Sequence, residues 1–134
     1  MPATDNAFTA KTLNQKSDDA TYAGALSFMR RKYSKDLSGV DAVVMSVAVG
    51  PGPRTPEGDA QAHAIANEKL AAVLKLVNDA SESVVLARSA SEIEAAQTAG
   101  KVALILGFQN ARSLEGNVST LDAFYAAGVR VFGL

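Results

Sequence analysis

Two side-chain amides and a guanidinium occur together in the segment "GFQNARSL" (residues 107–114), directly after the apolar run "KVALIL". Gln109 and Asn110 can each donate and accept hydrogen bonds, and an amide oxygen can ligate a hard metal ion. An amide carries no negative charge, so it is a poor ligand for zinc. Together with Arg112, these residues indicate polar groups at the mouth of a pocket. A turn whose amides bond to neighbouring backbone remains the alternative.

Few other residues in the chain offer site chemistry. There is no cysteine and a single histidine, His63, which excludes thiolate chemistry, HExxH zinc sites and a multi-histidine cage built within this chain. His63 falls beside the apolar stripe of a long predicted helix, so we expect a half-buried or surface histidine rather than a ligand. The segment "GPGPRTPEG" (residues 50–58) could bind an anion with help from Arg54, but it lacks the dinucleotide-binding and Walker spacings. A proline-stiffened loop is the favoured interpretation.

Composition limits the class of protein. The chain has 134 residues, of which 48% are hydrophobic and 20% charged, and we expect one α/β domain over residues 21–134 after a polar lead-in over residues 1–20. A net charge of -1 argues against a nucleic-acid partner. No apolar run approaches the roughly 20 residues of a membrane span, and the N-terminus has no apolar segment of a secretory signal. We therefore expect a soluble protein, and the sequence leaves its compartment open.

Four apolar segments alternate with helical patterns. Strands are predicted over residues 40–49, 83–87, 102–107 and 129–134, and a first helix over residues 22–35. A second helix is predicted over residues 57–77, with Thr55 as N-cap and an apolar stripe of Ile65, Leu70, Val73, Leu74 and Val77. A third begins at Ser89 or Ser91 and ends before Gly100, and a fourth ends at Gly128 with Leu121, Phe124 and Tyr125 inward.

The alternation of strand and helix predicts right-handed βαβ units on a parallel sheet, which is an α/β fold. In such folds the chemistry lies on loops that follow the carboxyl ends of the strands. Here the last strand ends the chain, and four strands are half of an eight-stranded barrel, which needs about 250 residues. We therefore expect about half of a (β/α)8 TIM barrel, with a small open parallel sheet as the alternative. An exposed barrel edge would favour homo-oligomers.

Two long segments resemble one protein family. Residues 84–134, "VVLARSASEIEAAQTAGKVALILGFQNARSLEGNVSTLDAFYAAGVRVFGL", resemble the central part of the membrane (renal) dipeptidase family of zinc metallopeptidases. The similarity lies in a helix that ends in a Gly-Lys pair, a strand ending near "ALILGFQ", and the helix-strand unit that ends in "AAGVR". Residues 40–58, "VDAVVMSVAVGPGPRTPEG", resemble the preceding strand and its exit loop. The resemblance covers Val40 to Leu134.

The resemblance implies a metal-dependent hydrolase barrel in which two zinc ions activate water to cleave dipeptides or similar small amides. The family's ligands are an early His-x-Asp, a bridging Glu and two later histidines. The bridging Glu falls on Gln109, no His-x-Asp precedes Val40, and the chain stops before the later histidines. Arg112 occupies the position of a histidine common in the family. With an amide in place of the bridging carboxylate, at best one metal ion binds well or the pair binds weakly.

These observations predict a fragment of a dipeptidase-like metallohydrolase that is inactive as this isolated chain. Gln109 is the candidate metal-side residue, and Asn110 and Arg112 are candidate substrate-binding residues. The alternative from a different class is a non-catalytic α/β module that binds a small ligand or serves as a scaffold, and that can self-associate as a dimer.

Overall fold

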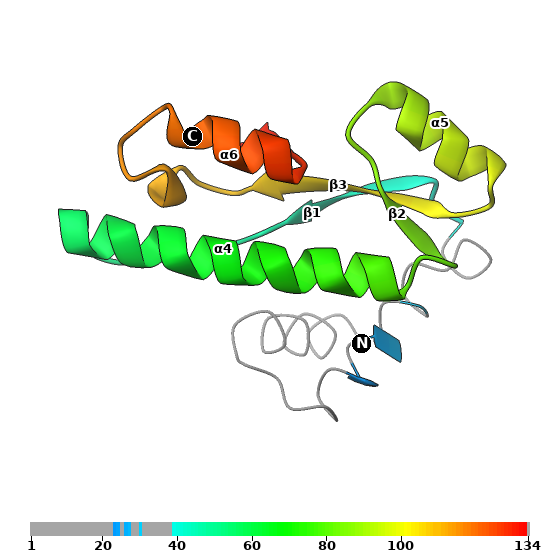
Figure 1. Cartoon of the computed structure of the whole chain (residues 1–134), viewed down its shortest axis with the longest axis horizontal. Helices are drawn as coiled ribbons and strands as arrows, with labels where there is room; N and C mark the ends of the chain where they lie inside the picture. Colours follow the sequence, from blue (N-terminus) through cyan, green and yellow to red (C-terminus); the bar gives the residue numbers. More distant parts are fainter. Residues whose placement is uncertain (1–22, 25, 28–29, 31–38, 134) are drawn as a thin grey trace.

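The computed structural model describes residues 23–24, 26–27, 30 and 39–133 (Figure 1). The predicted lead-in over residues 1–20 lies outside these residues, and so does most of the helix predicted over residues 22–35, whose described positions are helical. The elements that follow are β1 Ala42–Ser46, α4 Pro56–Asp79, β2 Val84–Leu86, α5 Ala90–Thr98, β3 Val102–Phe108, the 3-10 turn η1 Arg112–Leu114, α6 Thr120–Ala127 and β4 Val129–Phe132. Within this described part, no helix is long and apolar enough to cross a membrane.

All the strand pairs are parallel, and β3 is the central strand. β1 follows one edge of β3, from Ala42 opposite Ala103 to Ser46 opposite Gly107. The other edge is shared, because β2 pairs with residues 102–104 of β3 and β4 pairs with residues 106–108. The predicted parallel α/β class is confirmed. At its carboxyl end the sheet has the order β1-β3-β4, while β2 ends half-way along β3.

Helix α4 supplies most of the core on one face of the sheet. Its buried side chains include Leu70, Val73 and Val77 of the predicted stripe, while Ile65 and Leu74 are partly buried at the edge of the core. The strands contribute Met45, Val84, Val102, Leu104, Leu106, Phe108 and Val129 to this core, which also includes Val47 and Val49 of the loop after β1 and Phe124 of α6. Fully burying one such side chain contributes about 1.5–3 kcal/mol. This face therefore holds the sheet together.

Helix α5 lies on the opposite side of the sheet from α4 (Figure 1) and covers only part of that face. Its Ala96 packs against Ala87 and Ala103, and these small side chains let helix and sheet approach closely. Toward the carboxyl end of the strands the same face is open, and Val44 and Val131 remain 53% and 44% exposed.

The helix ends follow the predicted caps. Thr55 Oγ1 accepts a hydrogen bond from Gly58 N at 3.1 Å, and Ser89 Oγ accepts one from Glu92 N at 3.3 Å. Gly100 and Gly128 adopt left-handed backbone angles, with φ of 71° and 114°. These four caps are confirmed, with Ser89 rather than Ser91 at the start of α5.

The inward orientation predicted for α6 is wrong at one residue. Phe124 is buried and Leu121 is half-buried, but Tyr125 is 53% exposed. The guanidinium carbon of Arg130 lies 3.7 Å from the centroid of the Tyr125 ring. Tyr125 therefore faces outward and packs against an arginine of β4 instead of the core.

Candidate functional site

Two loops meet at the carboxyl end of the sheet, and side chains join them. The two loops are the β1 exit loop (residues 47–55) and the β3 exit loop (residues 109–119), which includes η1. The β1–β3 ladder is extended by Val47 N, which donates to Gly107 O at 2.7 Å. Beyond that bond, the next three carbonyls of the β1 exit loop, those of Ala48, Val49 and Gly50, each accept a hydrogen bond from a side chain. The donors are Lys69 Nζ to Ala48, Asn110 Nδ2 to Val49 at 3.1 Å, and Arg112 Nη1 to Gly50.

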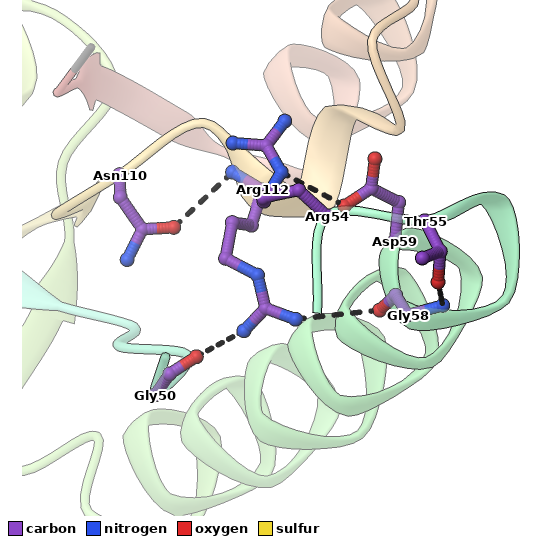
Figure 2. A network of polar contacts seen from close by, with 7 residues as sticks. All are labelled: Gly50, Arg54, Thr55, Gly58, Asp59, Asn110 and Arg112. Atoms are coloured by element: carbon purple, nitrogen blue, oxygen red, sulfur yellow. Dashed lines mark hydrogen bonds and ion pairs between the residues drawn. The ribbon is translucent and has the colours of Figure 1, made fainter. Parts of the chain in front are cut away.

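Arg112 contacts more elements than the other two donors. Its Nη2 donates to Gly58 O in the first turn of α4 at 3.4 Å, and its backbone N–H donates to Asn110 Oδ1 at 3.1 Å (Figure 2). Gly52 lies against the guanidinium so closely that a Cβ there would be 2.6 Å from Nη2. Arg112 therefore joins the β1 exit loop, the β3 exit loop and the start of α4.

His63 of α4 lies beneath the β3 exit loop. Its Nδ1 is 2.8 Å from Ser113 O, and its ring centroid is 5.4 Å from that of Phe124. The Phe124 ring in turn makes an edge-to-face contact with Phe108 at 4.7 Å. The half-buried position expected for His63 is confirmed, and the fold brings it to Ser113 in the loop after β3, which is 50 residues away in the sequence.

Gln109 is the first residue after β3, whose neighbours at this end of the sheet are β1 and β4. Gln109 is exposed. Gly133, the residue after β4, approaches it so closely that a Cβ on Gly133 would lie 2.4 Å from Gln109 O. Among the residues that the structure describes, no three His, Asp, Glu or Cys side chains gather to hold a metal ion. A neutral amide without such neighbours does not fit a two-zinc centre. Metal ligation by Gln109 stays a prediction.

Asn110 and Arg112 are half-buried, and the hydrogen bonds above direct their side chains to the protein's own backbone. Direct contact of either residue with a substrate stays a prediction. A third residue at this edge, Lys69, was not among the predicted site residues and is 7% exposed. Burial lowers the pKa of its ammonium group below the ordinary value of 10.5. The signal in the sequence was a lysine in the apolar stripe of α4, next to Leu70.

Comparison with known proteins identifies the family. The model of the membrane dipeptidase family (Peptidase family M19) matches residues 10–134. The chain belongs to the membrane dipeptidase family. Membership in this metallopeptidase family implies a metal cofactor. The resemblance seen in residues 40–134 is confirmed, and the family match begins further toward the N-terminus.

Solved structures show the same fold. An amidohydrolase from Pseudomonas aeruginosa is 24% identical with a TM-score of 0.60, over 96% of this chain and 35% of its own. The probable dipeptidase PvdM from the same organism is 22% identical with a TM-score of 0.63, over 91% of this chain and 29% of its own. A metallo peptidase from Rhodobacter sphaeroides is liganded with a phosphinate mimic of the dipeptide L-Ala-D-Ala. It is 17% identical with a TM-score of 0.58, over 66% of this chain and 31% of its own.

The fold of this membrane dipeptidase family member is therefore a segment of a TIM-barrel hydrolase, as the sequence predicted. The chain spans about a third of the length of the structures that it matches. A shorter similarity relates it to an agmatinase from Chromobacterium violaceum, 51% identical over 43 residues, or 32% of this chain and 13% of that protein.

Proposed function

We propose that this chain carries the central βα units of a dipeptidase-like hydrolase whose substrate is a dipeptide or a similarly small amide. The observation that carries the proposal is the place of Gln109, exposed at the carboxyl end of the central strand, where the family resemblance puts a bridging glutamate. Sites of parallel α/β enzymes lie at this end of the strands. A metallo peptidase of similar fold is liganded with a phosphinate mimic of L-Ala-D-Ala, which supports a dipeptide as substrate.

Gln109 can serve a small amide substrate without metal ligation. Its neutral amide can donate to a substrate carbonyl or carboxylate and accept from a substrate N–H. Asn110 and Arg112 flank it and shape the adjoining loop surface. The family implies two zinc ions, and the described residues bring no ligand set for them together. We therefore expect these 134 residues alone neither to hold the zinc pair nor to hydrolyse dipeptides.

Metal and turnover measurements test this proposal. The purified chain is stripped with chelator, reloaded with zinc and dialysed, and its zinc content is measured together with release of alanine from L-Ala-D-Ala. We expect clearly less than one zinc per chain and no turnover. Gln109→Glu should raise zinc affinity more than Gln61→Glu, which adds the same charge on the exposed surface of α4. Stoichiometric zinc with turnover in the unaltered chain would refute the expectation that the metal site of these 134 residues is incomplete. A full-length protein that hydrolyses no dipeptide would refute the proposed dipeptidase function.

A second candidate, a non-catalytic module that self-associates, is favoured by the open sheet face. Val44 lies opposite Ile105 and Val131 opposite Gly107, so both exposed valines belong to the face that α5 leaves uncovered. Sedimentation equilibrium of the unaltered chain and of Val44→Lys separates the candidates. A dimer that Val44→Lys dissociates would support the module, and a monomer at all concentrations would count against it.

A further inference from the structure

We propose that Arg112, assisted by Asn110 and Lys69, is a positioning residue that locks the β1 exit loop and the β3 exit loop into one rigid edge of the site. The proposal deepens the proposed function and rests on it, because this edge adjoins Gln109. It assigns these three side chains to the protein's own backbone instead of to a ligand.

The need for donors at this place follows from the geometry of the sheet. A buried carbonyl without a partner is costly, and regular strand pairing supplies a partner only while the ladder continues. After Val47 the β1 exit loop leaves the ladder. The carbonyls of half-buried Ala48 and buried Val49 are then satisfied by Lys69 and Asn110, and Arg112 bonds to the carbonyl of the next residue, the exposed Gly50.

The donors come from two different elements, so the hydrogen bonds to these carbonyls also connect the β1 exit loop to α4 and to the β3 exit loop. Lys69 is a residue of α4, while Asn110 and Arg112 belong to the β3 exit loop. Asn110 bonds in both directions, since its amide nitrogen donates to Val49 O and its amide oxygen accepts from Arg112 N. A displacement of one loop must therefore break bonds to the other.

Arg112 is the central member because it spans three segments. Its two terminal nitrogens bond to Gly50 O and Gly58 O, which lie on either side of the turn that leads into α4 (Figure 2). Gly52 lies directly against the guanidinium, so a Cβ at that position would force the end of the Arg112 side chain to shift. A planar guanidinium can make two such bonds at once, whereas an ammonium group acts as a single point charge.

Amide hydrogen exchange of the full 134-residue chain tests the proposal without substrate or metal. Arg112→Ala should accelerate exchange of the backbone amides in residues 48–54 and 109–114 together, by about tenfold. Arg112→Lys should restore protection only in part. Arg54→Ala is the matched control, since Arg54 lies in the same β1 exit loop but bonds to Asp59 of α4 and to no residue of the β3 exit loop that the structure shows (Figure 2).

The outcomes separate positioning from general stability. Faster exchange confined to the two loops, absent in Arg54→Ala, supports the lock. Equal acceleration throughout β3 would show a general loss of stability, and acceleration of one loop alone would show that the loops are not joined; either result overturns the proposal. Failure of dipeptide hydrolysis in the full-length protein leaves this measurement intact, so the two proposals fail independently.

Discussion

Two regions of the molecule are held by different kinds of contact: the α5 unit (residues 88–100) and the site edge, which is formed by Lys69, Asn110, Arg112 and the β1 exit loop. Around α5, Ser89 and Glu92 cap the first turn from within four residues: Ser89 Oγ accepts from Glu92 N, and a Glu92 oxygen accepts from Arg88 N at 2.5 Å. At the site edge the bonding residues are far apart in the sequence, by 61 residues for Asn110 and Val49 and by 62 for Arg112 and Gly50. The caps of α5 are therefore local contacts, whereas the site edge depends on contacts between segments that are distant in the sequence.

This difference has a consequence for how each region tolerates change. The α5 unit can form its caps before the sheet assembles, because every partner lies within one helical turn. The site edge exists only after β1, β3 and α4 have packed, because Lys69 of α4 and Asn110 and Arg112 of the β3 exit loop all bond to the β1 exit loop. Substitutions at the site edge should therefore disturb two loops at once, while substitutions around α5 should remain local.

A pair of glycine substitutions gives the largest expected contrast. A Cβ at Gly58 would lie 2.3 Å from Pro53 O, a backbone atom that cannot rotate away, whereas a Cβ at Gly100 meets nothing within 4 Å. We expect overpacking in Gly58→Ala to cost about 3 kcal/mol, reduced by the roughly 1 kcal/mol helix preference of alanine. Gly100→Ala should cost about 1 kcal/mol, because alanine must adopt the left-handed backbone there.

Urea unfolding measures both free energies, and hydrogen exchange shows where each change acts. Gly58→Ala should also loosen residues 50–54, and Gly100→Ala should leave the exit loops unchanged. A Gly58→Ala chain as stable as the unaltered one would mean that the β1 exit loop is not rigid.

A double-mutant cycle should give a smaller effect. Asn110→Ala and Arg112→Ala remove parts of one hydrogen-bond network, so we expect a coupling energy of about 1 kcal/mol between them. Arg130 also bonds to carbonyls, those of Arg88, Tyr125 and Val129, but it shares no partner with Arg112 in the residues that the structure shows. Arg112→Ala and Arg130→Ala should therefore be additive to within about 0.5 kcal/mol. Equal coupling in both cycles would mean that the site edge is no more connected than the rest of the sheet.

The same contrast explains what the sequence could predict. The caps at Thr55, Ser89, Gly100 and Gly128 were predictable because capping depends on residue types a few positions apart. The strands were predictable from continuous apolar runs, and the parallel sheet from their alternation with helices. The position of Gln109 at a strand end followed from these local signals alone.

Contacts between distant segments were not predictable in this way. Nothing near Arg112 in the sequence indicates that its guanidinium bonds to Gly50 and Gly58, because the pairing depends on the register of β1 against β3. Tyr125 was misplaced although its partner is near in the sequence: the spacing along α6 gave no sign that Arg130, which follows in β4, would pack on its ring. Roles that depend on such contacts, including those of Asn110 and Lys69, require the assembled fold.

The smallest expected effect is a pH dependence at the site edge. Burial lowers the pKa of Lys69 below 10.5 in the folded state, so between that lowered pKa and 10.5 the unfolded chain binds more protons at this residue than the folded chain. The contribution of Lys69 to the free energy of unfolding must then rise as pH increases through this window. Below the window the full cost of burying the charged ammonium remains. The neutral amine can still donate to Ala48 O, so the bond to the β1 exit loop is retained at high pH.

Lys69→Met keeps the length of the side chain and removes the titration. The difference in unfolding free energy between the unaltered chain and Lys69→Met should move in favour of the unaltered chain as pH rises from neutral toward 10.5. Lys75→Met is the matched control on the same helix, because the Lys75 side chain is 61% exposed and pairs with Asp79 at the helix surface. Its difference should show no such rise. If the difference in unfolding free energy for Lys69→Met does not change with pH, the ammonium group is in contact with water. The site edge would then not be packed around the hydrogen bond to Ala48 O.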